Sequence, residues 1–214
     1  MPRSSTSSEK PTAEKLIDIT LDLIDQHGGA RGVNLREVAR RAGCAHTNVY
    51  NYFPSLEALL GAALKSLLQR LITFTQSQMA ADKVRDRAGF ARFLNAQIDF
   101  AVQHPGWYAF IWLDPLEGFQ VDEEAMQTFR FMSSRFAGII TTLAGPSLTP
   151  AQAERASNLL HSYLHGEICK LLNDRYLDHT PEQYRQQILT GCSSLLDGLL
   201  AVPPGKKKLK EKGR

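Results

Sequence analysis

The chain has 214 residues, of which 43% are hydrophobic and 22% are charged, and its formal net charge is +3. This composition contains no run that approaches the roughly eighteen apolar residues of a membrane span, and no apolar signal-peptide core follows the N-terminus. Three cysteines at unrelated spacings argue against a disulfide framework. We therefore expect a soluble cytoplasmic protein with no membrane partner, large enough for one large core or for a small domain beside a larger one.

The N-terminal part predicts a flexible arm followed by one amphipathic helix. Residues 1–10 are rich in Ser and Thr, and we expect them to form a disordered arm. A proline at position 11 and Glu14 in the first turn favour a helix start. His27 and the two glycines after it end that helix. Its apolar face contains Ala13, Leu16, Ile17, Thr20, Leu21 and Ile24.

Residues 34–53 form the pattern on which the functional prediction depends. Asn34 is a favourable N-cap, and Glu37 follows three residues later as in a capping box. Gly43 ends this helix, because glycine tolerates the left-handed conformation of a C-terminal cap. A second helix over about 46–52 would bury Val49 and Phe53. Two short helices around a tight turn are typical of a DNA-binding helix-turn-helix. The outward side chains of the second helix suit base edges and phosphates: His46, Thr47, Asn48, Tyr50 and Asn51.

The same segment resembles the DNA-binding domain of TetR-type (tetracycline-repressor-like) regulators. This resemblance implies an all-α fold, with an N-terminal three-helix helix-turn-helix domain joined by a long helix to a larger helical ligand-binding and dimerisation domain. It also implies a homodimeric transcriptional repressor that binds a near-palindromic operator in double-stranded DNA. The matching positions within residues 32–60 are Val33, Val38, Ala39, Gly43, Val49, Tyr50, Phe53, Glu57, Leu59 and Leu60.

The resemblance also suggests which side chains contact DNA. We expect base contacts from Thr47, Asn48 and Asn51, with His46 at the edge of the contact. We expect phosphate contacts from a second group of larger side chains, of which Tyr50 matches the family motif best: Tyr50, Tyr52, Arg36 and Arg41.

Three residues depart from the family pattern. Ala45 replaces the serine that usually caps the recognition helix, and Leu56 replaces a lysine that usually holds a phosphate. Cys44 replaces a small aliphatic residue, and it could sense oxidants, although nothing in the sequence indicates a lowered thiol pKa. We therefore expect weaker anchoring to the DNA backbone without a change of function.

The positive charge is not concentrated in the DNA-binding segment. Residues 206–214 contain six basic residues and one acidic residue, so that the rest of the chain sums to −2. Residues 1–60 contain seven basic and seven acidic residues, which cancel. DNA affinity must then come from local placement of arginines, while the lysine-rich tail could add a salt-sensitive, nonspecific term.

The remainder of the chain predicts helices throughout. A long helix over residues 56–79 connects the DNA-binding segment to the rest of the chain, and in the family it transmits ligand binding to the DNA. Further helices are expected over 88–103, 107–113, 122–143, 151–173 and 181–202. The predicted organisation is a disordered arm over 1–10, a DNA-binding domain over 11–60, an effector-binding and dimerisation domain over 61–202, and a basic disordered tail over 203–214.

The last two helices predict a homodimer interface. Between positions 186 and 202 the only charged residue is Asp197, and several residues are Gly or Ser. A helix with so little charge is buried on more than one side. Two such helices from each subunit could form a four-helix bundle, which is the family's usual interface, although a core within one chain would also explain the pattern.

Aromatic residues after position 100 suggest a site for a hydrophobic or aromatic small-molecule effector, although they could instead fill a core. His104-Pro105 and His165-Gly166 resemble motifs in one subgroup of the family's C-terminal domains. The candidate ligand-binding residues are Trp107, Phe110, Trp112, Phe129 and His165.

The sequence offers little for other functions. The spacing of His161, His165 and Cys169 places them on one helical face, but no further ligand completes a metal site. No phosphate loop and no catalytic motif is recognisable, so we expect neither an enzyme nor a cofactor. The alternatives are a helical DNA-organising protein without an effector, a protein-interaction module, or a helical enzyme with an unrecognised site.

Overall fold

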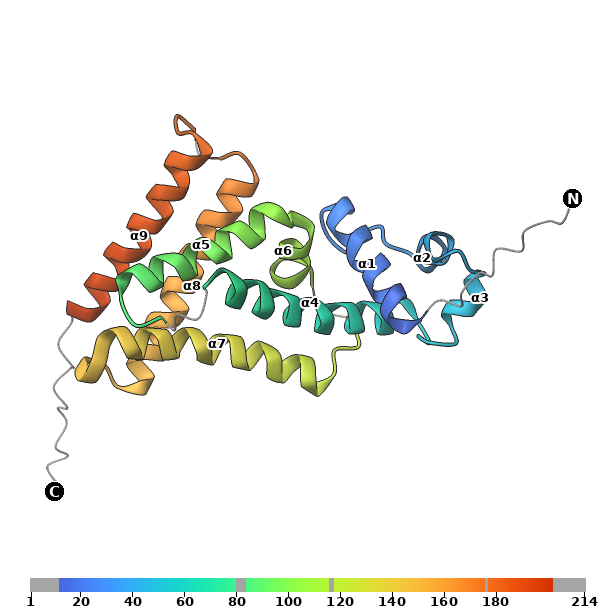
Figure 1. Cartoon of the computed structure of the whole chain (residues 1–214), viewed down its shortest axis with the longest axis horizontal. Coiled ribbons are helices and arrows are strands. Elements are labelled where there is room, and N and C mark those ends of the chain that lie inside the picture. Colours follow the sequence, from blue (N-terminus) through green and yellow to red (C-terminus); the bar gives the residue numbers. More distant parts are fainter. Residues whose placement is uncertain (1–11, 80–83, 116–117, 176, 202–214) are drawn as a thin grey trace, which may run out of the picture. The chain divides into compact units, whose positions relative to one another are not determined.

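The computed structural model describes residues 12–79, 84–115, 118–175 and 177–201, and within these ranges it contains helices and no strand. This confirms the predicted all-α class. The helices are α1 (Ala13–His27), α2 (Leu35–Ala42), α3 (His46–Val49), α4 (Leu56–Gln78), α5 (Arg87–Gln103), α6 (Pro105–Trp112), α7 (Glu123–Ala144), α8 (Pro150–Leu172) and α9 (Pro181–Ala201), with a 3₁₀ turn at Gly145–Ser147 (Figure 1).

The chain forms two compact units. Unit 1 comprises Met1–Ser77 and Asp99–Arg130, and unit 2 comprises Gln78–Ile98 and Phe131–Arg214. In Figure 1 the blue helices α1 to α3 and most of the teal α4 belong to unit 1, whereas the orange and red α8 and α9 belong to unit 2. The predicted functional boundary at residue 60 stays a prediction, and the predicted arm and tail lie outside the described residues.

The first helices begin and end where the local sequence requires. The Thr12 side chain accepts a hydrogen bond from the Lys15 N–H, and Gly28 ends α1 with a left-handed φ of 73°. The Asn34 side chain caps α2 through the Glu37 N–H at 3.0 Å, and Gly43 ends α2 with a φ of 71°. The core beneath these helices is apolar and fully or almost fully buried: Leu16, Leu21, Ile24, Val38, Ala39 and Val49.

The recognition helix α3 is shorter than the sequence predicted. It covers His46–Val49 instead of about 46–52, and Tyr50 is its C-cap. The N–H groups of Asn51 and Tyr52 bond to carbonyls three residues earlier, so the chain continues as tighter turns. Pro54 keeps Phe53 out of helical backbone, but it does not account for the end of α3 at Val49, four residues earlier.

Helix α6 packs on α1 with backbone against backbone. A Cβ added at Gly106 would lie 2.4 Å from the Ile24 carbonyl oxygen and 2.5 Å from the Asp25 Cα. Only glycine therefore fits between the two helices, and the first turn of α6 lies directly on the second half of α1.

Unit 2 is built around α8 and α9, which are consecutive in sequence and pack on each other. Thr149 and Gln152 form a capping box at the start of α8. The buried face of α9 contains Ile188, Cys192 and Leu196, each with no exposed surface. Within the described residues, no helix is long and apolar enough to cross a membrane.

The contact at Gly106 yields a stability prediction. Gly106→Ala should lower the free energy of unfolding by about 3 kcal/mol, because the new methyl group meets backbone atoms that cannot rotate away. Denaturant unfolding followed by circular dichroism measures the change. Gly138→Ala in α7 is the matched control: its Cβ would meet nothing within 4 Å, so it should stabilise by about 0.5–1 kcal/mol. Equal effects in both variants would contradict the close packing of α6 on α1.

Candidate nucleic-acid interface

The exposed surface of α3 and the turn after it consists of short polar and aromatic side chains. Thr47, Asn48 and Asn51 are exposed, while Val49 is fully buried beneath them. Val49 and the buried Phe53 therefore fix the short helix to the core, and the polar side chains face solvent. This is the arrangement that hydrogen bonding to base edges requires.

Two tyrosines flank this polar surface. Tyr50 is 49% exposed and Tyr52 is 41% exposed, which is unusual for such large rings. The His46 ring meets the Tyr50 ring edge-on with 5.2 Å between the ring centroids. His46 therefore restricts the orientation of Tyr50, so that its hydroxyl is presented to solvent in a limited set of directions.

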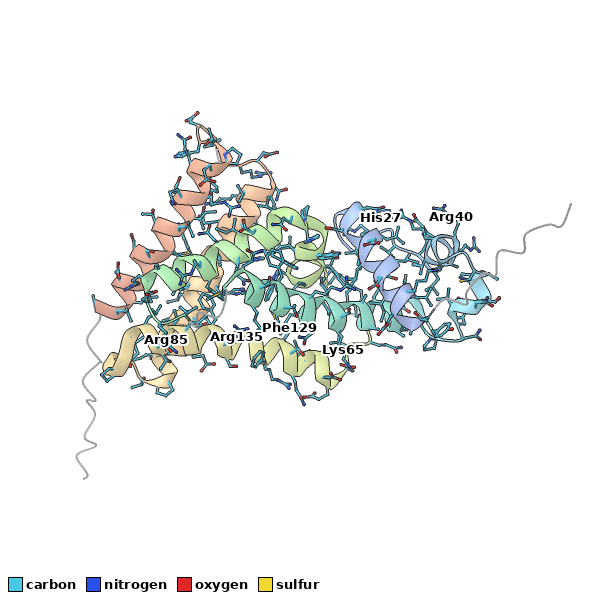
Figure 2. The ribbon with its side chains drawn as sticks, viewed as in Figure 1. His27, Arg40, Lys65, Arg85, Phe129 and Arg135 are labelled. Atoms are coloured by element: carbon cyan, nitrogen blue, oxygen red, sulfur yellow. The ribbon has the colours of Figure 1, made fainter. Side chains whose placement is uncertain are left out.

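Two arginines of α2, Arg40 and Arg41, share the carboxylate of Glu37. Arg41 Nη2 lies 3.3 Å from Glu37 Oε1, and Arg40 Nη2 lies 3.8 Å from the same oxygen. Arg41 also donates to Gln26 Oε1 on α1 at 2.8 Å. Arg36 and Arg40 are exposed, and Figure 2 marks Arg40 on α2. Glu37 therefore reduces the positive charge that α2 presents beside α3.

Helix α3 has no side-chain cap, as expected from Ala45, whereas α4 has one. Ala45 precedes α3 and offers no side-chain cap, and the Asn48 N–H bonds to the Ala45 carbonyl at the start of the helix. Ser55 caps the next helix, because its hydroxyl accepts from the Ala58 N–H at 3.2 Å. Sequence reasoning missed Ser55, although a serine directly before a helical pattern is a recognisable signal.

Asp25 of α1 connects the helix-turn-helix to α6. Its carboxylate accepts from the backbone N–H groups of Gly106 at 3.1 Å and Trp107 at 3.4 Å. It also lies 2.8 Å from His104 Nδ1. A side chain of α1 thus caps the N-terminus of α6.

Asp114 makes the second polar connection, at the other end of α6. Its Oδ2 accepts from the Ala30 N–H at 2.7 Å, between α1 and α2. Both ends of α6 are therefore bonded to the DNA-binding segment. No sequence signal could reveal these contacts, because 79 to 84 residues separate the partners.

The aromatic residues predicted to bind a ligand are placed in packing contacts of unit 1. Trp107 stacks on His104 at 3.9 Å and donates its Nε1–H to the Leu21 carbonyl at 2.7 Å. Phe110 is fully buried against Phe119. The remaining pair, Trp112 and Phe129, meets edge-to-face at 6.1 Å. Figure 2 marks Phe129 on α7.

His165, the fifth candidate, belongs to unit 2. Its Nε2 lies 3.7 Å from Cys169 Sγ, and its ring stacks with that of His161 at 6.3 Å. Burial lowers the pKa of His165, and burial together with His165 lowers the pKa of His161. Both imidazoles are thus held neutral. The described residues contain no group of three or more side chains that could hold a metal ion.

The α8–α9 contact contains buried titratable groups. The Tyr184 hydroxyl donates to Glu167, and burial followed by this bond raises the pKa of Tyr184. Burial, with a smaller effect of Glu167, raises the pKa of the Cys192 thiol to about 12. Burial also raises the pKa of Cys169. These thiols are therefore protonated at neutral pH and poorly reactive.

The helix-turn-helix matches a known family. Residues 16–63 match the family described as "Bacterial regulatory proteins, tetR family". Over 67 residues the chain is 37% identical to the HTH-type transcriptional repressor KstR of Rhodococcus jostii (strain RHA1), a match that covers 31% of each protein. The helix-turn-helix segment of the chain is thus similar to the DNA-binding domain of tetR-family regulators. The match to this repressor spans about a third of its length, so the likeness in sequence concerns that part of the repressor alone.

Solved structures share the fold over almost the whole chain. A tetR-family transcriptional regulator from Streptomyces coelicolor superposes with a TM-score of 0.66 at 17% identity, covering 88% of this chain and 89% of that one. The regulator FadR from Bacillus subtilis, solved in complex with stearoyl-CoA, gives 0.61 at 14% identity, covering 89% and 98%. A Rhodococcus sp. RHA1 protein of unknown function gives 0.73 at 18% identity, covering 92% and 100%. At these identities the likeness shows the fold.

The Asp25 contact can be tested without DNA. Asp25→Ala should lower the free energy of unfolding by about 1–3 kcal/mol, because the N–H groups at the start of α6 lose their acceptor. Asp22→Ala, at an exposed position of the same helix, should change it by less than about 0.5 kcal/mol. Thermal or denaturant unfolding compares the two. Similar values would show that the Asp25 carboxylate does not hold α6.

Proposed function

We propose that the protein is a sequence-specific DNA-binding transcriptional regulator, a homodimeric repressor that releases its operator when a small molecule binds. The observation that supports this most directly is the polar surface of α3, held on a buried Val49 within a TetR-family helix-turn-helix. Such a helix inserts its outward side chains into the major groove. The site of action would be the cytoplasm.

The contacts to DNA follow from the exposed side chains. Thr47, Asn48 and Asn51 would contact bases, and His46 would lie at the edge while it orients Tyr50. Tyr50, Tyr52, Arg36 and Arg41 would contact phosphates. Arg41 contributes less than an unpaired arginine, because Glu37 and Gln26 already bind it. Phosphate contacts set the orientation, and base contacts set the sequence preference.

The homodimer would form through α8 and α9. Leu159 on α8 is 53% exposed, and the nearby Gly166 would leave an added Cβ with nothing within 4 Å. Gly198 on α9 is likewise open and exposed. Exposed leucine and glycine on adjacent helices favour close helix–helix packing with a second subunit. A two-fold dimer then presents two α3 helices to half-sites about one helical turn or more apart, roughly 34 Å per turn.

Response to an effector requires that the ligand bind with different affinity to the form of the dimer that fits the operator and to the form that does not. A tenfold loss of DNA affinity corresponds to about 1.4 kcal/mol of coupling. The contacts of Asp25 and Asp114 with α6 give such a coupling a physical route within unit 1. The FadR structure with stearoyl-CoA is one neighbour of this fold that binds a small molecule. A DNA-organising protein without an effector is the alternative, and it predicts binding without sequence preference.

The decisive experiment is an anisotropy titration on DNA from upstream of the protein's own gene, beside a scrambled duplex of equal length. It is run at about 50 and 200 mM salt, where nonspecific binding through phosphates loses orders of magnitude. Preference for the native fragment at the higher salt is the expected result. Equal affinity for both duplexes at the lower salt, with loss of both complexes at the higher salt, supports the DNA-organising alternative. No binding at low salt contradicts the proposal.

The two classes of contact can be separated by substitution. Tyr50→Ala should weaken binding to operator and scrambled DNA by about the same factor, because a phosphate contact is independent of sequence. Asn48→Ala should weaken operator binding and change the preferred base at one position in each half-site, by about 1–3 kcal/mol per contact. Competition against single-base operator variants measures this. Identical behaviour of the two variants on both DNAs would contradict the assignment.

Glu37 should limit nonspecific affinity. Glu37→Gln leaves Arg40 and Arg41 without a neutralising carboxylate but keeps a side chain suited to the start of α2. We expect several-fold tighter binding to scrambled DNA at about 50 mM salt and a steeper dependence on salt. Glu154→Gln, an exposed α8 position with the same charge change, is the control. If both variants bound scrambled DNA equally, net charge and not the arginine pair would be responsible.

A further inference from the structure

Unit 1 contains a cavity of about 760 Å³ along the solvent-facing side of α4. One side of it is formed by Ile17 of α1, and the other by residues between Gln120 and Thr128. None of the five aromatic or histidine candidates from the sequence lines it. We call this cavity the α4 groove, and all of its lining residues belong to unit 1.

The groove is elongated. Its α4 lining extends from Ala58 to Thr73, which corresponds to about 22 Å at 1.5 Å per helical residue. The backbone of Gln120 borders the groove near the start of α4, where a Cβ on Gly61 would lie 2.1 Å from the Gln120 carbonyl oxygen. The Gln120 N–H also bonds to the Glu57 carbonyl at 3.3 Å. These contacts hold the chain before α7 against α4.

The floor of the groove is formed by small side chains. Ala58, Ala62 and Ser66 follow each other at intervals of four residues on one side of α4. These small side chains leave room along α4 for an apolar chain, which the aliphatic stems of Lys65 and Arg70 would also contact. A volume of this size is in the range of small-molecule sites.

Two cations, Lys65 and Arg70, are less exposed than the carboxylates that pair with them. Lys65 Nζ lies 3.3 Å from Asp122 Oδ2 and pairs also with Glu124, and Figure 2 marks Lys65 beside the start of α7. The Lys65 side chain is 37% exposed, whereas those of Asp122 and Glu124 are 55% and 71% exposed. Such exposed ion pairs contribute little, so an incoming anion could replace the carboxylates if Asp122 and Glu124, which also line the groove, turn toward solvent.

Arg70 connects the groove to α1 and to α6. Its guanidinium pairs with Asp18 of α1 and lies 5.8 Å from the centre of the Trp107 ring. An anion that takes Arg70 from Asp18 removes a contact between α4 and the first helix of the DNA-binding segment. It also changes the surroundings of the Trp107 indole.

We propose that the α4 groove binds an elongated amphipathic carboxylate, with its anionic group on Lys65 or Arg70 and its unbranched apolar chain along Ala58, Ala62 and Ser66. The effect on DNA affinity rests on the proposed regulatory function, whereas the binding itself does not. Occupation of the groove replaces the Arg70–Asp18 pair where the anionic group binds Arg70, and the Lys65–Asp122 pair where it binds Lys65. It thereby shifts α1 relative to α4 and lowers the affinity for the operator.

The test uses the full chain and dodecanoate below its micelle-forming concentration, measured by titration calorimetry. Dodecylamine and hexanoate are the comparison ligands, since the first reverses the head-group charge and the second shortens the chain. Saturable binding of dodecanoate, at least tenfold tighter than either comparison ligand, is the expected result. No saturable heat with dodecanoate, or equal binding of dodecylamine, overturns the proposal.

Substitutions then locate the site. Ala62→Leu should fill the groove and weaken dodecanoate at least tenfold, as should Lys65→Gln combined with Arg70→Gln. Ala151→Leu, an exposed position in the first turn of α8, adds the same side chain elsewhere and should not change binding. Circular dichroism spectra show that each variant is folded. Unchanged affinity in Ala62→Leu would place the ligand elsewhere and contradict the proposal.

Fluorescence and DNA binding complete the test. In a Trp112→Phe background Trp107 is the remaining tryptophan, and dodecanoate should change its emission by displacing Arg70. Operator release by dodecanoate, and not by hexanoate, is expected in the anisotropy assay. Dodecanoate binding without operator release would refute the regulatory part alone. Failure of the protein to bind any DNA would refute the proposed function, and the calorimetry would still decide whether the groove is a binding site.

Discussion

The carboxylate of Asp25 bonds the end of α1 to the start of α6, and the function proposed for the protein depends on that connection. A helix N-terminus has N–H groups without partners inside the helix, so they need an acceptor from elsewhere. Asp25 supplies it from the DNA-binding segment, and Gly106 allows the two backbones to meet. Asp114 bonds the far end of α6 to Ala30. A movement of α6 is therefore resisted by hydrogen bonds at both of its ends, and α1 must follow.

The DNA-binding surface is balanced in charge, not strongly basic. Glu37 neutralises part of Arg40 and Arg41, and α3 has no side-chain cap. Both features reduce affinity for the phosphate backbone, which is the sequence-independent part of binding. Under the proposed function, relatively more of the affinity would come from base contacts by Thr47, Asn48 and Asn51. Weak affinity for the DNA backbone would also make the proposed complex easier to release, since a modest coupling energy would then suffice.

Local patterns predicted the helices well because each helix end has a local cause. Helix α2 begins after Asn34 and ends before Gly43, as expected. The predicted start of α9 at residue 181 is the observed one. The error at α3 arose because the apolar spacing of Val49 and Phe53 fits a longer helix, while the N–H groups of Asn51 and Tyr52 bond three residues back in tighter turns. The candidate ligand residues were chosen for their aromatic chemistry and for the family resemblance, and they stay a prediction. The structure shows that Trp107 donates to Leu21 and stacks on His104, and that His165 belongs to the other unit.

The sequence by itself determined the all-α class, the helix-turn-helix and the resemblance of that segment to the tetR family, because caps, helical periodicity and a family motif act over a few residues to a few tens of residues. Tertiary structure alone decided which side chains meet across larger separations. Asp25 and Gly106 are 81 residues apart, and Lys65 and Glu124 are 59 apart. Neither contact has a periodic or compositional signature, because the first depends on how α1 packs on α6 and the second on how α4 packs on α7. The α4 groove is a product of the same packing: its residues are ordinary in sequence and become a site only where three elements enclose them.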